Sequence, residues 1–411
     1  MLDPLPELSA AQAAARLGIK QETLYAYVSR GLLRRTRTST GSRFDAMEVE
    51  RFAERRARRP PSAPTSPAAS PGTPLMVVDT DVALIDSGEL FYRGRRAAEL
   101  ATTCSYDAVA AWIWGEAMEP GRTLRCSDSF VAPARRLVQA LPPTATLLDR
   151  VAVAVHGLAC ADPLRDDISP GRLAEIGEIL TAGIPRALAS APIDGTSIAG
   201  LLWGALAPGP PRDGHLAALN AALVLSIDHD LAISTFAARV AASARAPGYA
   251  VISAALGAFD SPLHGNASRE SAELLRAVLR GVSPDRAIRD QLRRRGRGVP
   301  GFGHPLYPDG DPRARALQAL VADLPDVQPV LGVSRAVEAV MADLGLLPNI
   351  DFALATLVVA SGLPSDAGAV VFALGRIAGW MANAMAEYEA PPLRLRPRGR
   401  YTGPDPSEPT L

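Results

Sequence analysis

Lysine is almost absent from this chain of 411 residues, because Lys20 is the only one. The absence excludes a P-loop, whose phosphate-binding motif requires a lysine. Nearly every positive charge is therefore an arginine guanidinium. Basic and acidic residues are equally numerous, at 43 each, so the chain as a whole is not basic.

Cysteine is also scarce, and Cys104, Cys126 and Cys160 are too scattered for a disulfide framework or a zinc site. The N-terminal residues lack the basic and apolar regions of a signal peptide. No apolar run reaches the roughly 18 residues of a membrane span, and the most apolar segment, 367–386, is spaced like a core helix. We therefore predict a soluble cytoplasmic protein with no metal and no cofactor. Hydrophobic residues make up 48% of the chain, which is enough for a large core.

The first 58 residues are predicted to form a separate basic module, because residues 1–59 carry 12 Lys/Arg against 7 Asp/Glu. Ser9 followed by Gln12 is a capping box, which predicts a helix over 10–17. Gly18 ends that helix, and a second helix follows over 21–29. Helix, tight turn and helix is the arrangement that places the second helix in the DNA major groove.

Arginines then flank a short Ser-Thr-Gly-Ser turn at 39–42, which suggests a hairpin wing, and a third helix is expected over 46–56. The module resembles the winged helix-turn-helix of the MerR and excisionase families. That resemblance implies DNA contacts from residues on the second helix and the wing: Lys20, Gln21, Tyr27, Arg34, Arg35, Arg37 and Arg43. Leu24, Tyr25 and Val28 would share one face of the second helix, and Tyr27 would face solvent. A basic helical hairpin used for protein contacts is the alternative.

Between the module and the rest of the chain lies a linker, 59–76, rich in proline, serine and alanine. From 77 to 411 the spacing of apolar residues predicts a mainly α body with roughly fifteen or more helices. Clear helical stretches are 107–114, 215–227, 271–279, 314–322 and 366–386. Only 75–86 and 88–92 look like strands or a hairpin.

The five histidines divide into two groups. His156 follows an apolar run and suggests a core histidine, and His215 suggests a solvated helix start. His229 lies in a richer polar setting. His264 and His304 occupy loops bounded by Gly and Pro, where side chains for chemistry are often displayed.

Charged residues beside apolar helices form a second set of candidates. Asp351 immediately precedes an apolar helix, so it is either a helix cap or a positioned base. Arg376 interrupts an apolar run, where a buried guanidinium needs an anion, from either a ligand or a core carboxylate. Arg313 and Arg396 are less telling alone.

In order, these motifs resemble the citrate synthase family over nearly all of residues 77–411. The blocks that carry the resemblance are Leu84-Ile85-Asp86 with Tyr92-Arg93-Gly94, Gly115-Glu116, His229 with Ser234-Thr235-Phe236, Pro262-Leu263-His264-Gly265, Gly301-Phe302-Gly303-His304 leading to Asp311-Pro312-Arg313, Asn349-Ile350-Asp351, and Arg396-Pro397-Arg398 with Tyr401-Thr402-Gly403. The resemblance implies a mainly α homodimer with a large and a small helical domain, the small one at roughly 266–355.

The resemblance also implies roles for individual residues. Asp351 would remove a methyl proton from acetyl-CoA, His264 would hydrogen-bond the thioester oxygen, and His304 would polarise the ketone of oxaloacetate. The oxaloacetate carboxylates would be bound by His229, Arg313, Arg376 and, from the partner subunit, Arg396. Condensation followed by hydrolysis would release citrate and CoA.

Several positions depart from the family pattern. Pro305 and Pro308 stand where the family usually has basic residues, and Ala232 stands where it usually has asparagine. The loop after His264 reads Gly-Asn-Ala-Ser in place of Gly-Gly-Ala-Asn. CoA phosphates would then need other ligands, for which the candidates are Arg293, Arg294, Arg295 and Arg297, although this cluster could equally be a solvated helix face.

Two alternative functions remain open at this stage. One is a sister enzyme, either a 2-methylcitrate synthase that uses propionyl-CoA or a citryl-CoA lyase. The other is a DNA-binding regulator whose synthase-like body senses a metabolite.

Overall fold

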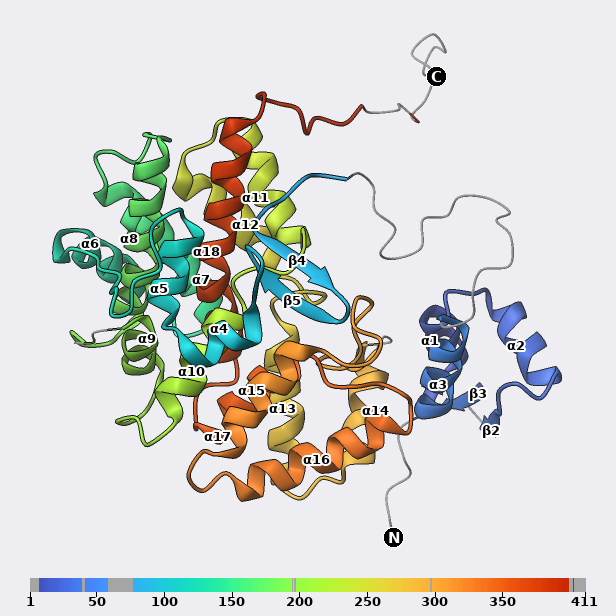
Figure 1. The fold of residues 1–411 in the computed structure, drawn as a ribbon. Helices are drawn as coiled ribbons and strands as arrows, with labels where there is room; N and C mark the ends of the chain where they lie inside the picture. The colour runs from blue at the N-terminus through green and yellow to red at the C-terminus, as the bar shows by residue number, and fades with distance from the viewer. Residues whose placement is uncertain are drawn as a thin grey trace.

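The computed structural model describes residues 7–38, 41–57, 77–193, 195, 197–295, 298–398 and 402. These form a small N-terminal module and a larger helical body (Figure 1). The predicted linker, 59–76, lies outside the described residues.

The module contains three strands and three helices. They are β1 (Glu7–Ser9), α1 (Ala10–Arg16), α2 (Gln21–Ser29), β2 (Thr36–Thr38), β3 (Gly41–Asp45) and α3 (Ala46–Ala57). The predicted capping box between Ser9 and Gln12 begins α1. The predicted wing is the β2–β3 hairpin, and β1, which the sequence analysis missed, pairs with β3 in the sheet order β1-β3-β2.

The module has its own apolar centre, in which Leu24 and Phe44 are almost completely buried. Tyr27 differs from prediction: its ring packs on Phe52 at 5.1 Å between centroids instead of facing solvent. Tyr25 is the exposed tyrosine, with the Arg35 guanidinium 5.7 Å above its ring. The reason is helical geometry, since Tyr27 lies three residues from Leu24 and shares its face, whereas Tyr25 is turned about 100° away.

The body is almost entirely helical, as predicted. A small antiparallel sheet, β4 (Ala83–Asp86), β5 (Glu89–Tyr92) and β6 (Arg95–Arg96), precedes fifteen helices in the described part of the chain. These are α4 (Ala97–Thr103), α5 (Tyr106–Ile113), α6 (Asp128–Gln139), α7 (Leu147–Ala161), α8 (Pro170–Leu188), α9 (Ile198–Leu206), α10 (His215–Leu225), α11 (Ile233–Ser243), α12 (Gly248–Phe259), α13 (Ala267–Leu279), α14 (Pro284–Arg295), α15 (Pro312–Ala322), α16 (Gln328–Ala342), α17 (Ile350–Ala360) and α18 (Ala367–Glu389).

Helix α18 runs through the centre of the larger group of helices, which we call the large domain (α4–α12 and α18) (Figure 1). It is long and apolar enough to cross a membrane, but 89% of its apolar window is buried in the protein, as in a core helix. Two glycines let it approach the end of α10 closely. A Cβ on Gly379 would lie 2.0 Å from the Ile227 carbonyl oxygen, and one on Gly375 would lie 2.5 Å from that of Leu223.

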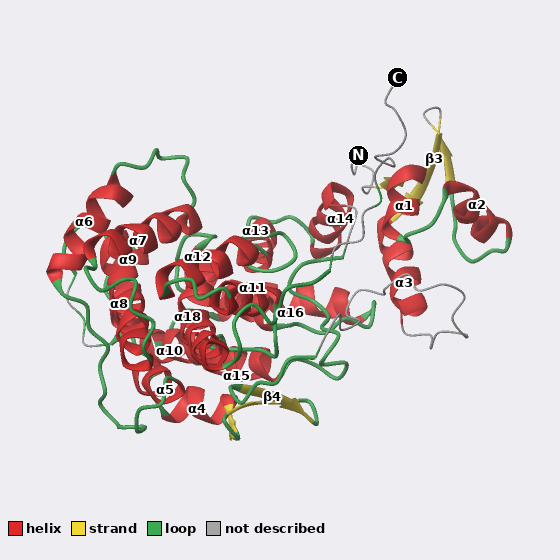
Figure 2. Ribbon diagram, turned by 90° about the horizontal axis from the view of Figure 1, so that it is seen from above, coloured by secondary structure: helices red, strands yellow, loops and turns green. Residues whose placement is uncertain are grey.

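Helices α13–α17 pack on one another as a second group, which we call the small domain. The predicted limits of this domain, 266 and 355, stay a prediction. Helix α14 lies on the side of this group that faces the N-terminal module, beside α3 (Figure 2).

Two histidine predictions were wrong, and they were wrong in opposite directions. His215 is buried against the Trp203 ring at 4.7 Å, and its Nδ1 accepts the Arg212 N–H. His156 is exposed on α7. The buried side of α7 includes Val151, Val155 and Leu158, which leaves position 156 facing outward.

Candidate active site

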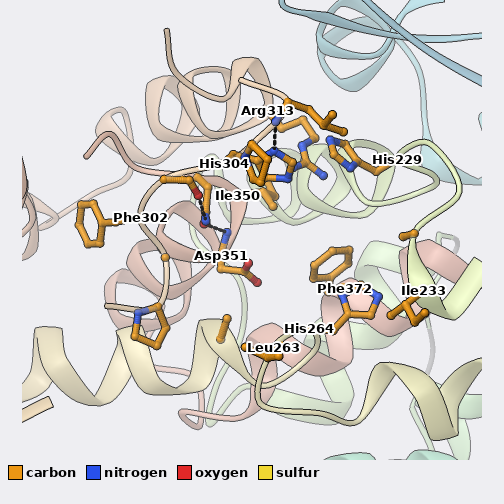
Figure 3. Close-up of a pocket in the computed structure, with 18 of the residues that line it drawn as sticks. His229, Ile233, Leu263, His264, Phe302, His304, Arg313, Ile350, Asp351 and Phe372 are labelled. Carbon is orange, nitrogen blue, oxygen red and sulfur yellow. Dashed lines mark hydrogen bonds between the residues drawn. The ribbon is translucent and has the colours of Figure 1, made fainter. Parts of the chain in front are cut away.

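A cleft of about 760 Å³ lies between the large and small domains. The six residues predicted to act within one subunit all line it: His229, His264, His304, Arg313, Asp351 and Arg376. The large domain contributes His229, the His264 loop and α18, and the small domain contributes the rest. In Figure 3 the Asp351 carboxylate points toward the side of the cleft that holds His264 and Phe372.

His264 is held in one orientation by a short hydrogen-bonded chain. The Trp380 indole N–H donates to Ser234 Oγ at 3.2 Å, and Ser234 Oγ lies 2.8 Å from His264 Nε2. Among the described residues the Ser234 hydroxyl has no hydrogen-bond acceptor other than Nε2, so it donates to Nε2 and the histidine proton resides on Nδ1. Burial, then Arg376 and Arg313, lower the pKa of His264 to about 3. His264 is therefore a neutral hydrogen-bond donor at physiological pH.

His304 takes the complementary tautomer. Its Nδ1 accepts the backbone N–H of Leu306 at 3.2 Å, which places the ring proton on Nε2. Burial and the charge of Arg313 lower the pKa of His304 to about 4. It is thus a second neutral donor in the same cleft.

His229 lies edge-on to His304, with 4.8 Å between ring centroids. Its Nε2 is 3.1 Å from the Tyr307 hydroxyl, which lies three residues beyond His304. Burial and the nearby Arg313 hold the pKa of His229 well below its ordinary value. Tyr307 therefore fixes the ring, a role that the sequence analysis did not assign.

Asp351 is not the helix cap that the sequence left open as an alternative. Asn349 caps α17, since its Oδ1 accepts the Asp351 N–H at 3.0 Å and its Nδ2 donates to the Gly303 carbonyl at 3.1 Å. The Asp351 carboxylate is left free for the cleft, and its buried Oδ1 has no hydrogen-bond partner among the described residues. Burial raises the pKa of Asp351 to about 7, even though Arg313 opposes the shift. A carboxyl group with a pKa near neutrality is suited to general base catalysis.

Arg313 is positioned by Asp311, the N-cap residue of α15. Its Nε and Nη2 donate to the two Asp311 oxygens at 3.0 and 2.8 Å, and Asp311 Oδ2 also accepts the Ile350 N–H. Burial alone would raise the pKa of Asp311, but Arg313 lowers it overall. The ion pair thus links α15, which carries Arg313, to the start of α17, which carries Asp351.

Arg376 extends from α18 and is almost completely buried, with 1% of its surface exposed. Its Nε donates to the Ser226 carbonyl at 2.6 Å, and its guanidinium lies 4.9 Å from the Phe372 ring. Within the described residues Nη1 has no hydrogen-bond partner and no carboxylate forms an ion pair with the side chain. Burial lowers the pKa of Arg376 to about 10, so the group stays charged and suits an anionic ligand.

The other predicted site residues lie elsewhere. Arg396 is exposed beyond the end of α18. Arg293 and Arg294 are exposed on α14 and are not among the described residues that line the cleft. Nothing is described of the Arg295 side chain, and Arg297 lies outside the described residues. The described residues include no group of three or more His, Cys, Asp and Glu that could hold a metal ion.

Fold and site together define a two-domain helical protein whose interdomain cleft presents a raised-pKa carboxylate, two neutral imidazole donors and two buried guanidiniums. A family model described as "Citrate synthase, C-terminal domain" matches residues 72–398, and one described as "Helix-turn-helix domain" matches residues 7–57. The chain therefore belongs to the citrate synthase family and carries an N-terminal helix-turn-helix domain.

Individual relatives agree with this placement. The chain is 30% identical to the citrate synthase of Haloferax volcanii over 358 residues, which cover 80% of this chain and 94% of that protein. It is 28% identical to the 2-methylcitrate synthase of Mycobacterium tuberculosis, covering 84% and 93% of the two chains. A citrate synthase structure from Thermoplasma acidophilum, in ternary complex with carboxymethyl coenzyme A and oxaloacetate, superposes with a TM-score of 0.68 over 82% of this chain and 96% of that one, at 23% identity. That last likeness shows the fold alone.

Proposed function

We propose that this protein condenses an acyl-CoA with oxaloacetate and hydrolyses the product to a tricarboxylic acid and free CoA, with acetyl-CoA and citrate as the first candidates. The observation that carries the proposal is that the Asp351 carboxylate shares one cleft with two histidines, and the tautomer of each histidine leaves a donor nitrogen without a hydrogen-bond partner among the described residues. Its family and its relatives support the same reaction class.

Oxaloacetate would bind through its two carboxylates. Arg376 supplies an unpartnered buried Nη1, and Arg313 supplies a second guanidinium held at a fixed angle by Asp311. Guanidiniums bind carboxylates with forked geometry, which fixes the orientation of a small dianion. His229 would add a further polar contact. In a homodimer, Arg396 of the second subunit would complete the site.

Proton removal would fall to Asp351. A thioester methyl group is a very weak acid, so the base acts only if a donor stabilises the oxygen on which negative charge develops. His264 Nδ1–H would donate to that oxygen. The resulting carbon nucleophile would attack the ketone carbon of oxaloacetate, with His304 Nε2–H donating to the ketone oxygen. Water would then cleave the thioester of the condensed product and release CoA.

The acyl-CoA itself is less closely defined. Exposed apolar residues stand on facing walls of the cleft, Ile233 and Leu263 on the large domain and Leu306 on the small one. They suit an acyl chain and the apolar part of its carrier, and they fit acetyl and propionyl groups alike. A 2-methylcitrate synthase is therefore the second candidate, and the relative of that name favours keeping it. Arg293 and Arg294 remain candidate phosphate ligands only if CoA extends over α14.

A free-thiol assay tests the enzyme proposal. Acetyl-CoA and propionyl-CoA are each supplied with oxaloacetate, and thiol release is compared with that of Asp351→Asn. Thiol release that requires both substrates and disappears in the variant supports the proposal. Release that is unchanged in the variant, or absent with every pair, would contradict it.

We infer that the helix-turn-helix domain binds DNA. The protein would then be a cytoplasmic enzyme with a DNA-binding regulatory domain. The observation in favour is a set of exposed polar and basic side chains on this domain. Lys20 and Gln21 are exposed at the start of α2, Arg34 and Arg35 on the segment before β2, and Arg37 on β2, while Arg43 of β3 is half-buried. Binding to duplex DNA that weakens steeply with salt and discriminates between sequences would support this role. Binding that ignores sequence would contradict it.

A further inference from the structure

The N-terminal module contacts the small domain through its β1, α1 and α3 side. Arg289 of α14 forms an ion pair with Asp45 at the end of β3, and Gln12 of α1 donates to the Arg293 carbonyl at 3.3 Å. The Arg289 side chain is 13% exposed and the Asp45 side chain is 41% exposed, so this ion pair lies at the edge of the contact. The module is therefore docked at α14.

A third contact lies at the rim of the active-site cleft. Glu50 of α3, which is 1% exposed, pairs with Arg16 of α1. This pair meets Gly298, where a Cβ would lie 3.3 Å from Glu50 Oε1 and 3.7 Å from Arg16 Nη2. Gly298, Val299 and Pro300 all line the cleft. This short segment thus contacts the module and also lines the cleft.

The same segment continues directly into the catalytic groups. The Pro300 carbonyl accepts from Ser271 Oγ at 3.0 Å, and the Gly301 carbonyl accepts the Asn349 N–H at 2.9 Å. Asn349 in turn bonds the Gly303 carbonyl and the Asp351 N–H. The module contacts Gly298, the backbone runs from there to Gly301, and two hydrogen bonds connect Gly301 through Asn349 to Asp351.

The docked face of the module is not the face that carries α2. Helix α2 lies on the side of the module away from the body in both ribbon views (Figures 1 and 2). The contacts with α14 come chiefly from α3 and β1. A ligand can therefore fill the cleft, and a partner can contact α2, while the module remains docked.

From these contacts we propose that docking of the N-terminal module on α14 is coupled to occupancy of the cleft. A ligand that orders segment 298–303 favours the docked module, and docking favours ligand binding by the same factor, because such coupling is reciprocal. The fraction of protein with the module docked therefore depends on whether the cleft holds ligand. This inference rests on the proposed function in one respect only, that oxaloacetate and CoA bind in the cleft.

Hydrogen exchange of the full chain tests the coupling without requiring turnover. Amide exchange in α1 and α3 is followed with and without saturating oxaloacetate plus CoA. We expect these helices, which do not line the cleft, to exchange more slowly when both ligands are present. The slowing is expected to disappear in Arg289→Gln and in Asp45→Asn. The asparagine keeps an acceptor for the Glu48 N–H that Asp45 caps, so α3 is preserved.

Ligand affinity supplies the reciprocal measurement. Each interface variant should weaken CoA binding in the presence of oxaloacetate by about 5-fold, at the lower end of usual coupling strengths. The double variant should bind CoA no more weakly than either single variant, because both substitutions remove the same ion pair. Arg335→Ala, which removes an exposed charge from α16 of the same domain, should change neither property.

The outcomes separate the two proposals. If oxaloacetate and CoA do not bind the wild-type chain, the proposed function and the coupling fall together. If they bind, or if the enzyme turns over, while exchange in α1 and α3 and the affinities of the variants stay unchanged, the coupling alone is overturned.

Discussion

Ser234 and His264 are joined by a 2.8 Å hydrogen bond, and the Trp380 indole N–H donates to the same serine oxygen. The serine selects the histidine tautomer and leaves Nδ1–H facing the cleft. The chemistry of His264 thus depends on a residue that need not touch the substrate.

Ser234→Ala is therefore expected to lower kcat by about 10- to 100-fold, since the imidazole loses its fixed tautomer and orientation. The KM for oxaloacetate should change little, because the guanidiniums are untouched. Steady-state kinetics check this result. Ser243→Ala is the matched control, because Ser243 is also buried on α11, and among the described residues its hydroxyl bonds only the Val240 carbonyl of its own helix. Equal losses in both variants would indicate general damage to α11.

The pH dependence of kcat/KM should show one acidic limb near pH 7. Asp351 must be ionised to accept a proton, and burial raises its pKa to about 7. His264 and His304, with pKa values of about 3 and 4, stay neutral above pH 5 and add no second limb there. Rates measured between pH 5 and 9 check the profile. A profile that stays flat between pH 5 and 9 would contradict a base with a pKa near 7.

Asp351→Asn should abolish turnover and yet stabilise the folded protein above pH 7. The folded-state pKa is raised above the unfolded value of about 3.9, so ionisation destabilises the folded state as pH rises from about 4 to 7. Asparagine does not ionise, so the variant lacks this destabilisation. We expect a gain in the free energy of unfolding of about 1–2 kcal/mol at pH 8, discounted because the side chain is partly exposed, and none at pH 4. Denaturant titrations at both pH values check the difference.

Arg376→Gln should separate ligand binding from stability. Its buried Nη1 has no hydrogen-bond partner among the described residues, so its removal should cost the ligand-free protein little while raising the KM for oxaloacetate at least 100-fold. Arg239→Gln offers the contrast, because Arg239 is equally buried but pairs with Glu387. Removing Arg239 should destabilise the fold by about 2 kcal/mol, because its bonds to the Asp79 carbonyl and Asn383 are also lost, while Glu387 keeps its pair with Arg394. Thermal unfolding with and without oxaloacetate distinguishes the two arginines.

The grouping of the proposed catalytic residues in one cleft was predictable because short motifs carry them. The loops around His264 and His304, and the Asn-Ile-Asp run at the start of α17, can each be recognised from a few consecutive residues. The positioning residues cannot. Tyr307 reaches His229 across 78 positions of the chain, and no local pattern records that contact.

Burial was harder to predict for the same reason. An apolar run before His156 suggested the core, but a helix packed along one side buries only part of such a run and leaves one position outward. Likewise, the predicted module boundaries followed from composition, whereas its docking at α14 depends on the ion pair between Asp45 and Arg289, 244 residues apart.

Lys20 precedes α2 as its N-cap residue, and its side chain is exposed. Since no other lysine exists in the chain, an amine-selective reagent has one side-chain target, at the start of the helix expected to enter a DNA groove. A dye or cross-linker can thus be attached to the module by ordinary acylation, without an engineered cysteine, and its protection would report whatever approaches that helix.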